Sequence, residues 1–245
     1  MNELKNLVAF QQVLSAYQPS LEAQKALRDL KLVLLAAPTS TGRNTLIRAL
    51  LETGTYRYIV SDTTRDPRVN DGVLEQSGKE YWFRSEAEVL AELRAGNYLE
   101  AAIIHRQQVS GISMRELEGA SREHKVAITD IEVAGVDSIM KVKPDTLAVF
   151  MVPPSFQEWQ HRLQQRSTMA ASEVRRRLQS ACRELQIALD RPYYTFVVSE
   201  AVPKTMQTIE QLVKQQVNDD EAQDLARALV QKIYEQTKAY IASLQ

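Results

Sequence analysis

The sequence predicts an α/β fold with a parallel sheet. Five strongly apolar runs lie along the chain, at residues 32–37, 56–61, 126–133, 146–152 and 195–199. Segments whose apolar residues recur at helical spacing alternate with these runs. Near-continuous apolar runs that alternate with helical patterns are typical of parallel strands covered by helices on both faces.

Helical patterns begin at the N-terminus. Apolar residues at helical spacing predict a first helix over residues 3–17. Ser20 can cap a second, short helix that ends at about Arg28. A further helix is predicted over residues 86–96. The segment 62–85 before it is polar and turn-rich.

The second half of the chain contains two longer helical stretches. Residues 155–189 are rich in arginine and show helical spacing that is interrupted near 167–171. Residues 219–245 predict one helix, which Asp219 or Asp220 can cap. Its apolar stripe consists of Leu225, Leu229, Ile233, Tyr240 and Leu244.

Composition and charge are those of an ordinary globular protein of one or two domains. The 245 residues are 44% hydrophobic and 25% charged, with a net charge of −1 and a pI of about 6.4. Nothing in this charge balance favours nucleic acid or an anionic membrane as a partner. The single cysteine, Cys182, excludes an intramolecular disulfide, and the three scattered histidines do not have the spacing of a zinc site. With neither a targeting segment nor an apolar run of roughly 20 residues, we expect a cytoplasmic protein.

A turn of small residues follows the first apolar run. Residues 36–45 read AAPTSTGRNT, between a predicted strand and an amphipathic helix. This is the layout of a phosphate-binding loop, whose usual pattern is Gly-x-x-x-x-Gly-Lys-[Ser/Thr]. Only Gly42 matches that pattern, because Ala37, Arg43 and Asn44 occupy the other signature positions. Alone, the turn is a weak signal, since small-residue turns are common in α/β proteins.

Two arginines follow the second apolar run. Arg65 and Arg68 flank Pro67, which stiffens the turn between them. The guanidinium group offers a planar fork of donors that suits a phosphate. In an arbitrary sequence, however, such a pair is more often a solvated part of a loop.

Several further segments match known motifs in order and spacing. VSDTTRDPR (60–68) matches Val-Ser-x-Thr-Thr-Arg-x-Pro-Arg, and GKEYWF (78–83) matches Gly-x-Asp-Tyr-x-Phe. AGNYLEAA (95–102) matches Gly-x-Phe-x-Glu-x-Ala, and ITDIEVAGV (128–136) matches Leu-Asp-Ile-Asp-x-Gln-Gly-Val. VFMVPPSFQEWQHRLQQRST and EVRRRLQSACREL match a lid and the helix that returns from it. Over about residues 31–215 the chain therefore resembles the guanylate kinase family.

The resemblance implies a P-loop NTPase core with a parallel sheet, an inserted lobe that binds a nucleoside monophosphate (NMP) and a small helical lid. Extra helices at residues 1–30 and 218–245 flank this guanylate-kinase-like domain of residues 31–217. Their apolar stripes pack either on the domain or on a second subunit in a homodimer. Within the domain we expect the core at 31–60, 120–155 and 180–217, the NMP-binding lobe at 61–119 and the lid at 156–179.

For guanosine monophosphate (GMP), the resemblance implies seven contacts, namely Ser61, Arg65, Arg68, Tyr81, Glu100, Ser110 and Glu132. Arg65, Arg68 and Tyr81 match the residues that hold the phosphate. Ser61 and Glu100 match residues that read the guanine edge. A buried carboxylate rejects bases that lack the matching donors, because an unpaired buried acceptor costs roughly 1–3 kcal/mol.

For ATP, the resemblance implies the loop residues Pro38, Thr39, Ser40, Thr41, Gly42, Arg43, Asn44 and Thr45. The catalytic set it implies is Arg43, Asp130, Arg162, Arg166 and Arg177. The three lid arginines in it would offset the charge on the transferring phosphoryl group. Asn44 and Asp130 are the residues expected to hold Mg²⁺. Trp159, His105 and Cys182 are expected to serve packing or the surface, and Arg175 and Arg176 to face solvent.

The chain departs from the family pattern mainly in the phosphate loop. Arg43 stands for the lysine that reaches the β- and γ-phosphates, and Asn44 for the hydroxyl that binds the metal. Ala37 and Ser40 stand for glycines, so each adds a Cβ where the backbone approaches phosphate or takes a positive φ. Together these changes predict weakened or altered handling of ATP.

The base-reading residues also differ. Ser110 falls where the family has a phosphate-binding tyrosine, and Ile112 where it has a guanine-contacting hydroxyl, unless Ser113 takes that place. Glu132 replaces an aspartate that contacts the guanine amino group, with one more methylene. The loop at 69–81 is longer than usual by about four residues. These changes leave the choice of base open.

The leading interpretation is a kinase that transfers the γ-phosphoryl group of ATP to GMP, with Mg²⁺. One alternative is a guanylate-kinase-like binding module that no longer turns over, because the acceptor arginines persist while the phosphate loop is altered. Another is a related kinase whose phosphorylated acceptor differs from GMP.

Overall fold

The computed structural model describes residues 3–70, 72–166, 171–214 and 220–243 of the chain. Helices alternate along it with strands that pair mainly in parallel, so the predicted α/β fold is confirmed. None of the described helices combines the length and apolar character needed to cross a bilayer. The chain forms two compact units. Unit 1 consists of Met1–Leu32, Tyr56–Thr129 and Asp137–Thr146, and unit 2 of Val33–Thr55, Asp130–Val136 and Leu147–Gln245.

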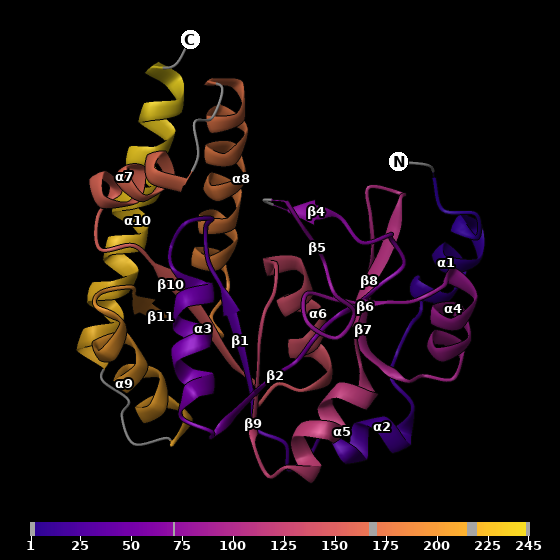
Figure 1. Ribbon diagram of the computed structural model, residues 1–245. Coiled ribbons are helices and arrows are strands. Elements are labelled where there is room, and N and C mark those ends of the chain that lie inside the picture. The colour runs from indigo at the N-terminus through magenta and orange to yellow at the C-terminus, as the bar shows by residue number, and fades with distance from the viewer. Residues whose placement is uncertain (1–2, 71, 167–170, 215–219, 244–245) are drawn as a thin grey trace. The chain divides into compact units, whose positions relative to one another are not determined.

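Unit 2 is built on three parallel strands in the order β11-β10-β1 (Figure 1). Leu35 of β1 lies opposite Val149 of β10, and Val149 lies opposite Thr195 of β11. Every residue of β1 is buried, which explains the apolar run at its position. The elements of this unit are β1 (Leu32–Ala36), α3 (Arg43–Glu52), β10 (Leu147–Val152), α7 (Phe156–Arg166), α8 (Ala171–Asp190), β11 (Tyr194–Val198), α9 (Val202–Val213) and α10 (Asp220–Ser243).

The C-terminal helix α10 packs along α8 and against β10 and β11. Its buried side chains are those of Ala226, Val230, Ile233 and Thr237. Leu225, which we expected in the apolar stripe, is instead 67% exposed. The buried stripe passes one residue further along, through Ala226, and one residue turns an α-helix by about 100°. Leu244 and Asp219 lie outside the described residues.

Unit 1 contains a four-stranded sheet in the order β6-β3-β8-β7, a parallel pair of β2 and β9, and a two-stranded hairpin of β4 and β5. Helices α1, α2, α4 and α5 belong to it, and α6 begins in unit 2 and ends in unit 1. Its elements are α1 (Leu7–Leu14), α2 (Leu21–Ala26), β2 (Tyr56–Tyr58), β3 (Asp62–Thr63), β4 (Val69–Asn70), β5 (Val73–Leu74), β6 (Trp82–Phe83), α4 (Glu86–Arg94), β7 (Tyr98–Ile104), β8 (Gln108–Ser113), α5 (Met114–Arg122), β9 (Val126–Asp130) and α6 (Val133–Val142).

The strands of unit 1 differ from the prediction in two ways. The segment 62–85, read only as turn-rich, contains four strands of two residues each, which are too short to give a periodic pattern. The apolar run at 126–133 is not strand throughout, because β9 ends at Asp130 and Val133 begins α6. Likewise, β2 ends at Tyr58, and the buried residues that follow it are not in a strand.

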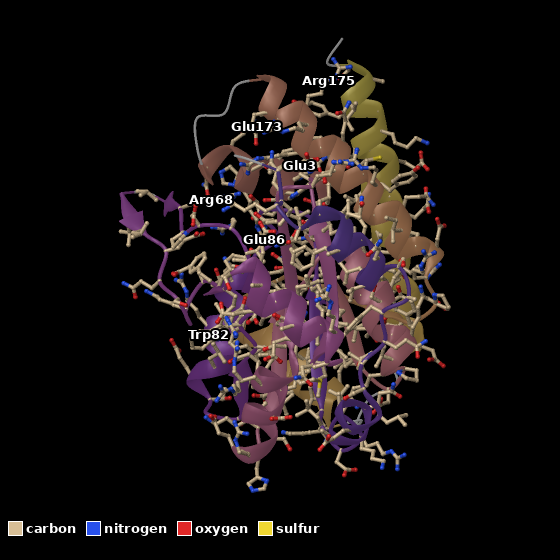
Figure 2. All side chains as sticks on the ribbon, turned by 90° about the vertical axis from the view of Figure 1, so that its right-hand side faces the viewer. Glu3, Arg68, Trp82, Glu86, Glu173 and Arg175 are labelled. Atoms are coloured by element: carbon tan, nitrogen blue, oxygen red, sulfur yellow. The ribbon has the colours of Figure 1, made fainter. Side chains whose placement is uncertain are left out.

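The N-terminal helix is shorter than the predicted 3–17, and the residues before it bond to the rest of unit 1 through their main-chain donors. The N–H groups of Lys5 and Asn6 donate to the carboxylate of Glu86 at 3.1 and 2.8 Å. Glu86 is labelled in Figure 2. The N–H of Leu4 donates to the carbonyl of Arg106. The segment is also anchored by an apolar cluster of Leu4, Leu7, Phe10, Val89, Leu90, Leu93, Tyr98 and Val109. Burial of each large apolar side chain contributes about 1.5–3 kcal/mol, so this extension is an integral part of unit 1.

Gly96 ends helix α4 as expected, and it also contacts the N-terminal extension. Its φ is +75°, and the N–H of Ser20 donates to its carbonyl at 3.0 Å. A Cβ at this position would lie 2.6 Å from the main-chain nitrogen of Ser20. Gly54 has nearly the same φ, +74°, but a Cβ there would have nothing within 4 Å.

We expect Gly96→Ala to lower the free energy of unfolding by about 3 kcal/mol, because the steric clash with Ser20 adds to the strain of a left-handed residue. Gly54→Ala should lower it by about 1 kcal/mol, through the strain alone. Urea denaturation of both variants separates the two contributions. Equal losses would contradict the close approach of the extension to Gly96.

Candidate functional site

A cavity of about 650 Å³ opens at the predicted phosphate loop of unit 2. This volume is within the usual range for small-molecule sites. The predicted loop residues from 39 to 45 line it together with Asp130 and Arg162. The full lining is Thr39, Ser40, Thr41, Gly42, Arg43, Asn44, Thr45, Arg48, Asp130, Arg162 and Gln165.

The carbonyl groups of the loop are bonded to the surrounding protein. The hydroxyl of Thr41 donates to the Pro38 carbonyl at 2.7 Å. The indole Nε1 of Trp159, a fully buried side chain, donates to the Thr39 carbonyl at 2.8 Å. The hydroxyl of Ser199 donates to the Thr41 carbonyl at 2.6 Å. Trp159 therefore has the packing role we expected, and in addition it holds the loop.

The start of α3 supplies main-chain donors to the same cavity. The N–H of Leu46 bonds to the Gly42 carbonyl at 3.1 Å, so the N–H groups of Arg43, Asn44 and Thr45 precede the first bond inside the helix. A helix N-terminus carries a partial positive charge and binds anions through such groups. Gly42 takes a φ of +104° in the loop that leads into it. The loop thus keeps the geometry of an anion cradle.

The two replaced glycines of the loop behave differently. Ser40 has a φ of +65°, so its backbone takes the left-handed conformation. For a residue with a Cβ this conformation costs about 1–2 kcal/mol. Its hydroxyl is buried and has no hydrogen-bond partner among the described residues. Ala37 has no positive φ. The expected positive φ is therefore found at Ser40 and not at Ala37, and the approach of either Cβ to phosphate stays a prediction.

Arginine side chains give the cavity a positive lining from three positions, Arg43, Arg48 and Arg162. Arg162 is already engaged, because it pairs with Glu158 at 2.8 Å and donates to the Thr41 carbonyl at 3.3 Å. Arg48 was not singled out in the sequence, where it reads as one of several charges on an amphipathic helix.

The structure does not bring Arg177, another lid arginine, to this cavity. Arg177 pairs with Glu173 at 2.7 Å on α8 and is not part of the lining (Figure 2 labels Glu173). Arg166 ends α7, and its side chain lies outside the described residues. Arg176 is exposed as expected and pairs with the same Glu173.

A carboxyl group that the sequence did not reveal lies near Arg43. Burial raises the pKa of Glu184, while its hydrogen bond with Ser180 and the charge of Arg43 lower that pKa. The negative charge of Glu132 raises it further, which places Glu132 near the same groups in unit 2. Glu184 follows Arg177 by seven residues, two turns of α8, and this spacing is the signal that could have found it.

Asp130 and Asn44 both line the cavity, and both offer oxygen. Within unit 2, the N–H of Ile131 donates to the Leu35 carbonyl at 3.1 Å, which holds Asp130 near the strand that leads into the loop. The described residues contain no cluster of three or more His, Cys, Asp or Glu side chains that could hold a metal. One carboxylate and one amide oxygen fit a cation such as Mg²⁺, which keeps several waters and shares phosphate oxygens.

Unit 1 holds a second group of predicted residues around Arg65. Its guanidinium forms a two-point ion pair with Glu75, at 2.5 Å from Nη1 and 2.9 Å from Nη2. The two side chains are only 8% and 7% exposed. The N–H of Arg68 donates to the same carboxylate at 2.8 Å, and the Tyr81 ring lies 4.9 Å from the Arg65 guanidinium carbon. Arg65, Tyr81 and the main chain of Arg68 are thus brought together.

Glu75 is the residue that sequence reasoning missed in this group. Its hydrogen bond holds the pKa of Arg65 above its ordinary value. Glu75 follows the β4–β5 hairpin, which forms the longer loop noted in the sequence. A charged residue in a turn-rich segment gives no sign of burial, so only the fold identifies this pair.

Glu100 is buried in strand β7 of the same unit. Burial raises the pKa of its carboxyl group to about 8, and the N–H of Ile112 opposes the shift. Ile112 lies directly opposite Glu100 on β8. Ser113 lies opposite Tyr98 at the end of β8, directly before α5, and its buried hydroxyl has no partner among the described residues, so its possible contact with guanine stays a prediction.

The remaining GMP candidates are distributed less tightly. Ser110 donates to the Thr63 hydroxyl at 3.0 Å in the sheet of unit 1. Ser61 is half-buried, and its carbonyl accepts from the N–H of Trp82. Glu132 belongs to unit 2, where it is exposed.

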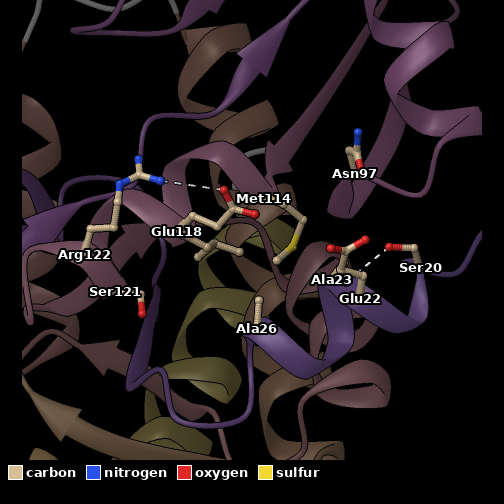
Figure 3. Close-up of a pocket in the computed structure, with 10 residues that line it drawn as sticks. Ser20, Glu22, Ala23, Ala26, Asn97, Met114, Glu118, Ser121 and Arg122 are labelled. Atoms are coloured by element: carbon tan, nitrogen blue, oxygen red, sulfur yellow. Dashed lines mark hydrogen bonds and ion pairs between the residues drawn. The ribbon is translucent and has the colours of Figure 1, made fainter.

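A second cavity in unit 1, of about 390 Å³, contains none of the predicted site residues. It lies between α2 and α5, where Met114 and Ala26 face it and Glu118 pairs with Arg122 (Figure 3). Its lining combines apolar and polar side chains without a buried, unpaired polar group. It therefore carries no functional assignment.

Comparison with known proteins identifies the class. The family model of guanylate kinases matches residues 29–216. The guanylate kinase of Porphyromonas gingivalis is 34% identical over 161 residues, which are 64% of this chain and 84% of that protein. That of Rhodococcus jostii is 36% identical over 167 residues, 67% of this chain and 79% of that protein. The chain therefore belongs to the guanylate kinase family.

A solved structure agrees with this assignment. The crystal structure of guanylate kinase from Anaplasma phagocytophilum has a TM-score of 0.55 with this chain at 23% identity, and covers 78% of this chain and 88% of that one. It supports the P-loop NTPase fold. Helices α1 and α10 lie outside the family match.

We expect Glu75→Gln to lower the free energy of unfolding by about 3 kcal/mol, because it leaves the buried Arg65 cation without its counter-ion. Inorganic phosphate should restore part of this loss by supplying a negative charge at the same place. Thermal unfolding with and without phosphate measures both effects. Glu80→Gln, at a residue that accepts a main-chain N–H in the same loop, is the control. A phosphate-induced shift no larger in Glu75→Gln than in the control would contradict an anion site at Arg65.

Proposed function

We propose that this chain is a guanylate kinase that transfers the γ-phosphoryl group of ATP to GMP and forms ADP and GDP. The observation that carries the proposal is the anion cradle of unit 2, whose main-chain donors and positive charge survive the change of its signature residues. The relatives named guanylate kinase support the choice of acceptor. A homodimer and a cytoplasmic location stay predictions.

Each residue of the ATP subsite has a definite role in this proposal. The N–H groups at the start of α3 and the guanidinium of Arg43 hold the triphosphate. Asn44 and Asp130 would hold Mg²⁺, which would supply positive charge to offset that of the triphosphate. In transfer, an oxygen of the acceptor phosphate bonds to the γ-phosphorus while the bond to the β-phosphate oxygen breaks. Arg162 offsets the charge on the transferring group, and the same role for the lid residues Arg166 and Arg177 stays a prediction.

Apart from Glu132, the residues proposed to hold the acceptor belong to unit 1. Arg65, Arg68 and Tyr81 bind its phosphate, with Ser110 in the place of the family tyrosine. Ser61 and Glu100 read the guanine, and Glu132 is the residue proposed for its amino group. Glu75 orients the Arg65 guanidinium by accepting hydrogen bonds from Nη1 and Nη2 of Arg65. A phosphate would therefore approach the edge of the guanidinium that carries Nε.

The second candidate is a binding module without turnover. The strained Ser40 and the altered Arg43 and Asn44 favour it, because each weakens a group that ATP requires. A kinase for a different phosphorylated acceptor is the third. It predicts binding that does not depend on the base.

The deciding experiment incubates the purified protein with ATP, Mg²⁺ and GMP and measures GDP directly. We expect GDP, with kcat lowered about 10²–10³-fold in Arg43→Ala and retained within about tenfold in Arg43→Lys, since one donor to a phosphoryl group has that effect. Arg43→Ala also controls for contaminating host kinase. GMP binding by calorimetry without GDP formation would favour the binding module. Absence of GMP binding would direct the search to other acceptors.

The raised pKa of the buried Glu100 predicts that GMP binding depends on pH. Guanine donates two N–H groups, which an ionised carboxylate accepts better than a neutral carboxyl group. Because the pKa of Glu100 is about 8, the group is mostly protonated at neutral pH, and binding GMP must ionise it. We expect the Kd for GMP to fall by several-fold to at most about tenfold per pH unit from pH 6.5 to 8.5. In Glu100→Gln, calorimetry should show a weaker Kd that is flat over this range, and an unchanged pH dependence would remove Glu100 from the site.

A further inference from the structure

The N-terminal extension contributes one polar side chain to the acceptor lobe of unit 1. Tyr17 follows α1 and precedes the part of the chain that the family model matches. Its hydroxyl donates to the Tyr98 carbonyl at 2.7 Å and accepts from the Tyr98 N–H at 2.8 Å. One hydroxyl thus satisfies both main-chain groups of a single residue.

Tyr98 lies where such support matters. It begins β7, which is an edge of the four-stranded sheet, so its outward main-chain groups have no neighbouring strand. Tyr98 pairs with Ser113 and Glu100 with Ile112, which leaves Leu99 as an extra residue and marks a β-bulge. A bulge redirects the side chains that follow it, and Glu100 is the first paired residue after it.

The side chain of Tyr98 is fixed as firmly as its main chain. Its hydroxyl donates to the buried Asp62 at 2.6 Å, and Asp62 also accepts from Arg115 at 2.7 Å. The N–H of Ser20 bonds to Gly96 two residues earlier. The extension therefore holds the chain at both Gly96 and Tyr98.

The Tyr17 hydroxyl is also close enough to Glu100 to sense its charge. The pKa of Tyr17 is raised to about 12, mainly by burial, and the negative charge of Glu100 contributes to the increase. The hydrogen bond with the Tyr98 main chain acts in the opposite direction. The hydroxyl, the bulge and Glu100 therefore form one local group.

We propose that Tyr17 is a positioning residue that fixes the bulge at Tyr98 and so directs the Glu100 carboxyl group toward a purine that carries a 2-amino group. The inference rests on the proposed function, in which Glu100 reads guanine. It adds that base discrimination in this chain depends on a segment outside the family match. Without the hydroxyl, the Tyr98 main chain exchanges its partner for water, and the bulge is free to shift.

The test compares GMP with inosine monophosphate (IMP), whose base lacks the 2-amino group, in the full chain and in Tyr17→Phe. Calorimetry should show GMP binding weakened about tenfold in the variant, as expected for loss of one well-placed hydrogen bond. IMP binding should change much less, so the ratio of the two affinities falls. With GMP as acceptor, KM should rise while kcat at saturation stays near that of the unmodified protein.

The control is Tyr240→Phe, which removes a hydroxyl from a ring that packs against Phe156 in unit 2. It should leave both affinities unchanged. A loss of GMP and IMP binding by the same factor in Tyr17→Phe would show a purely structural role and overturn the inference. A preserved ratio with unchanged affinities would overturn it as well.

Hydrogen exchange on the unmodified protein tests the same coupling even if the variant does not fold. Because the Tyr98 N–H bonds to Tyr17 beside Glu100, GMP should slow its exchange. An unchanged rate in the presence of bound GMP would overturn the inference. If the unmodified protein does not bind GMP at all, the proposed function fails, and this inference fails with it. If the unmodified protein binds GMP but the Tyr98 exchange rate does not change, only this inference fails.

Discussion

The candidate ATP subsite depends on the orientation of one short loop. An anion cradle requires main-chain N–H groups to face the ligand, and this in turn requires the carbonyl groups of the same loop to find partners in the protein. Trp159 and Ser199 supply two of these partners, at the Thr39 and Thr41 carbonyls. Neither residue belongs to the signature motif of the loop. The cradle is therefore maintained by buried side chains of distant segments, and it can persist when the signature residues change.

Charge in the described parts of both units follows a common pattern, in which arginines suited to phosphate are paired with carboxylates. Arg65 is paired with the buried Glu75, and Arg162 pairs with Glu158. Without a counter-ion the buried Arg65 would carry a large desolvation penalty, so Glu75 stabilises the protein before a ligand arrives. The same pairing orients the guanidinium group. The cost is weaker attraction for the incoming phosphate, because part of the positive charge is already offset.

Elements that many residues specify together could be predicted from the sequence, whereas contacts that the fold makes between single residues could not. The buried strands β1, β10 and β11 and the loop before α3 were predictable, because long apolar runs and ordered motifs carry redundant information. The strands of two residues in unit 1 have no period to detect. Glu75 is a buried charge on a segment that reads as polar, so only tertiary structure identifies it. Leu225 shows the related error of reading a helix stripe one residue out of phase.

The structure limits how far the altered phosphate loop is expected to impair the handling of ATP. Of the two replaced glycines, only Ser40 takes a conformation that glycine prefers, and its strain of about 1–2 kcal/mol is small beside the several contacts a triphosphate makes. Arg43 keeps the positive charge, though its planar fork reaches phosphate with a different geometry from that of an ammonium. Asn44 keeps an oxygen ligand on a longer side chain. The changes at Arg43 and Asn44 therefore alter the distance or direction of a contact but keep a positive charge and an oxygen ligand. This is the physical reason to expect slow turnover and not a complete loss of activity.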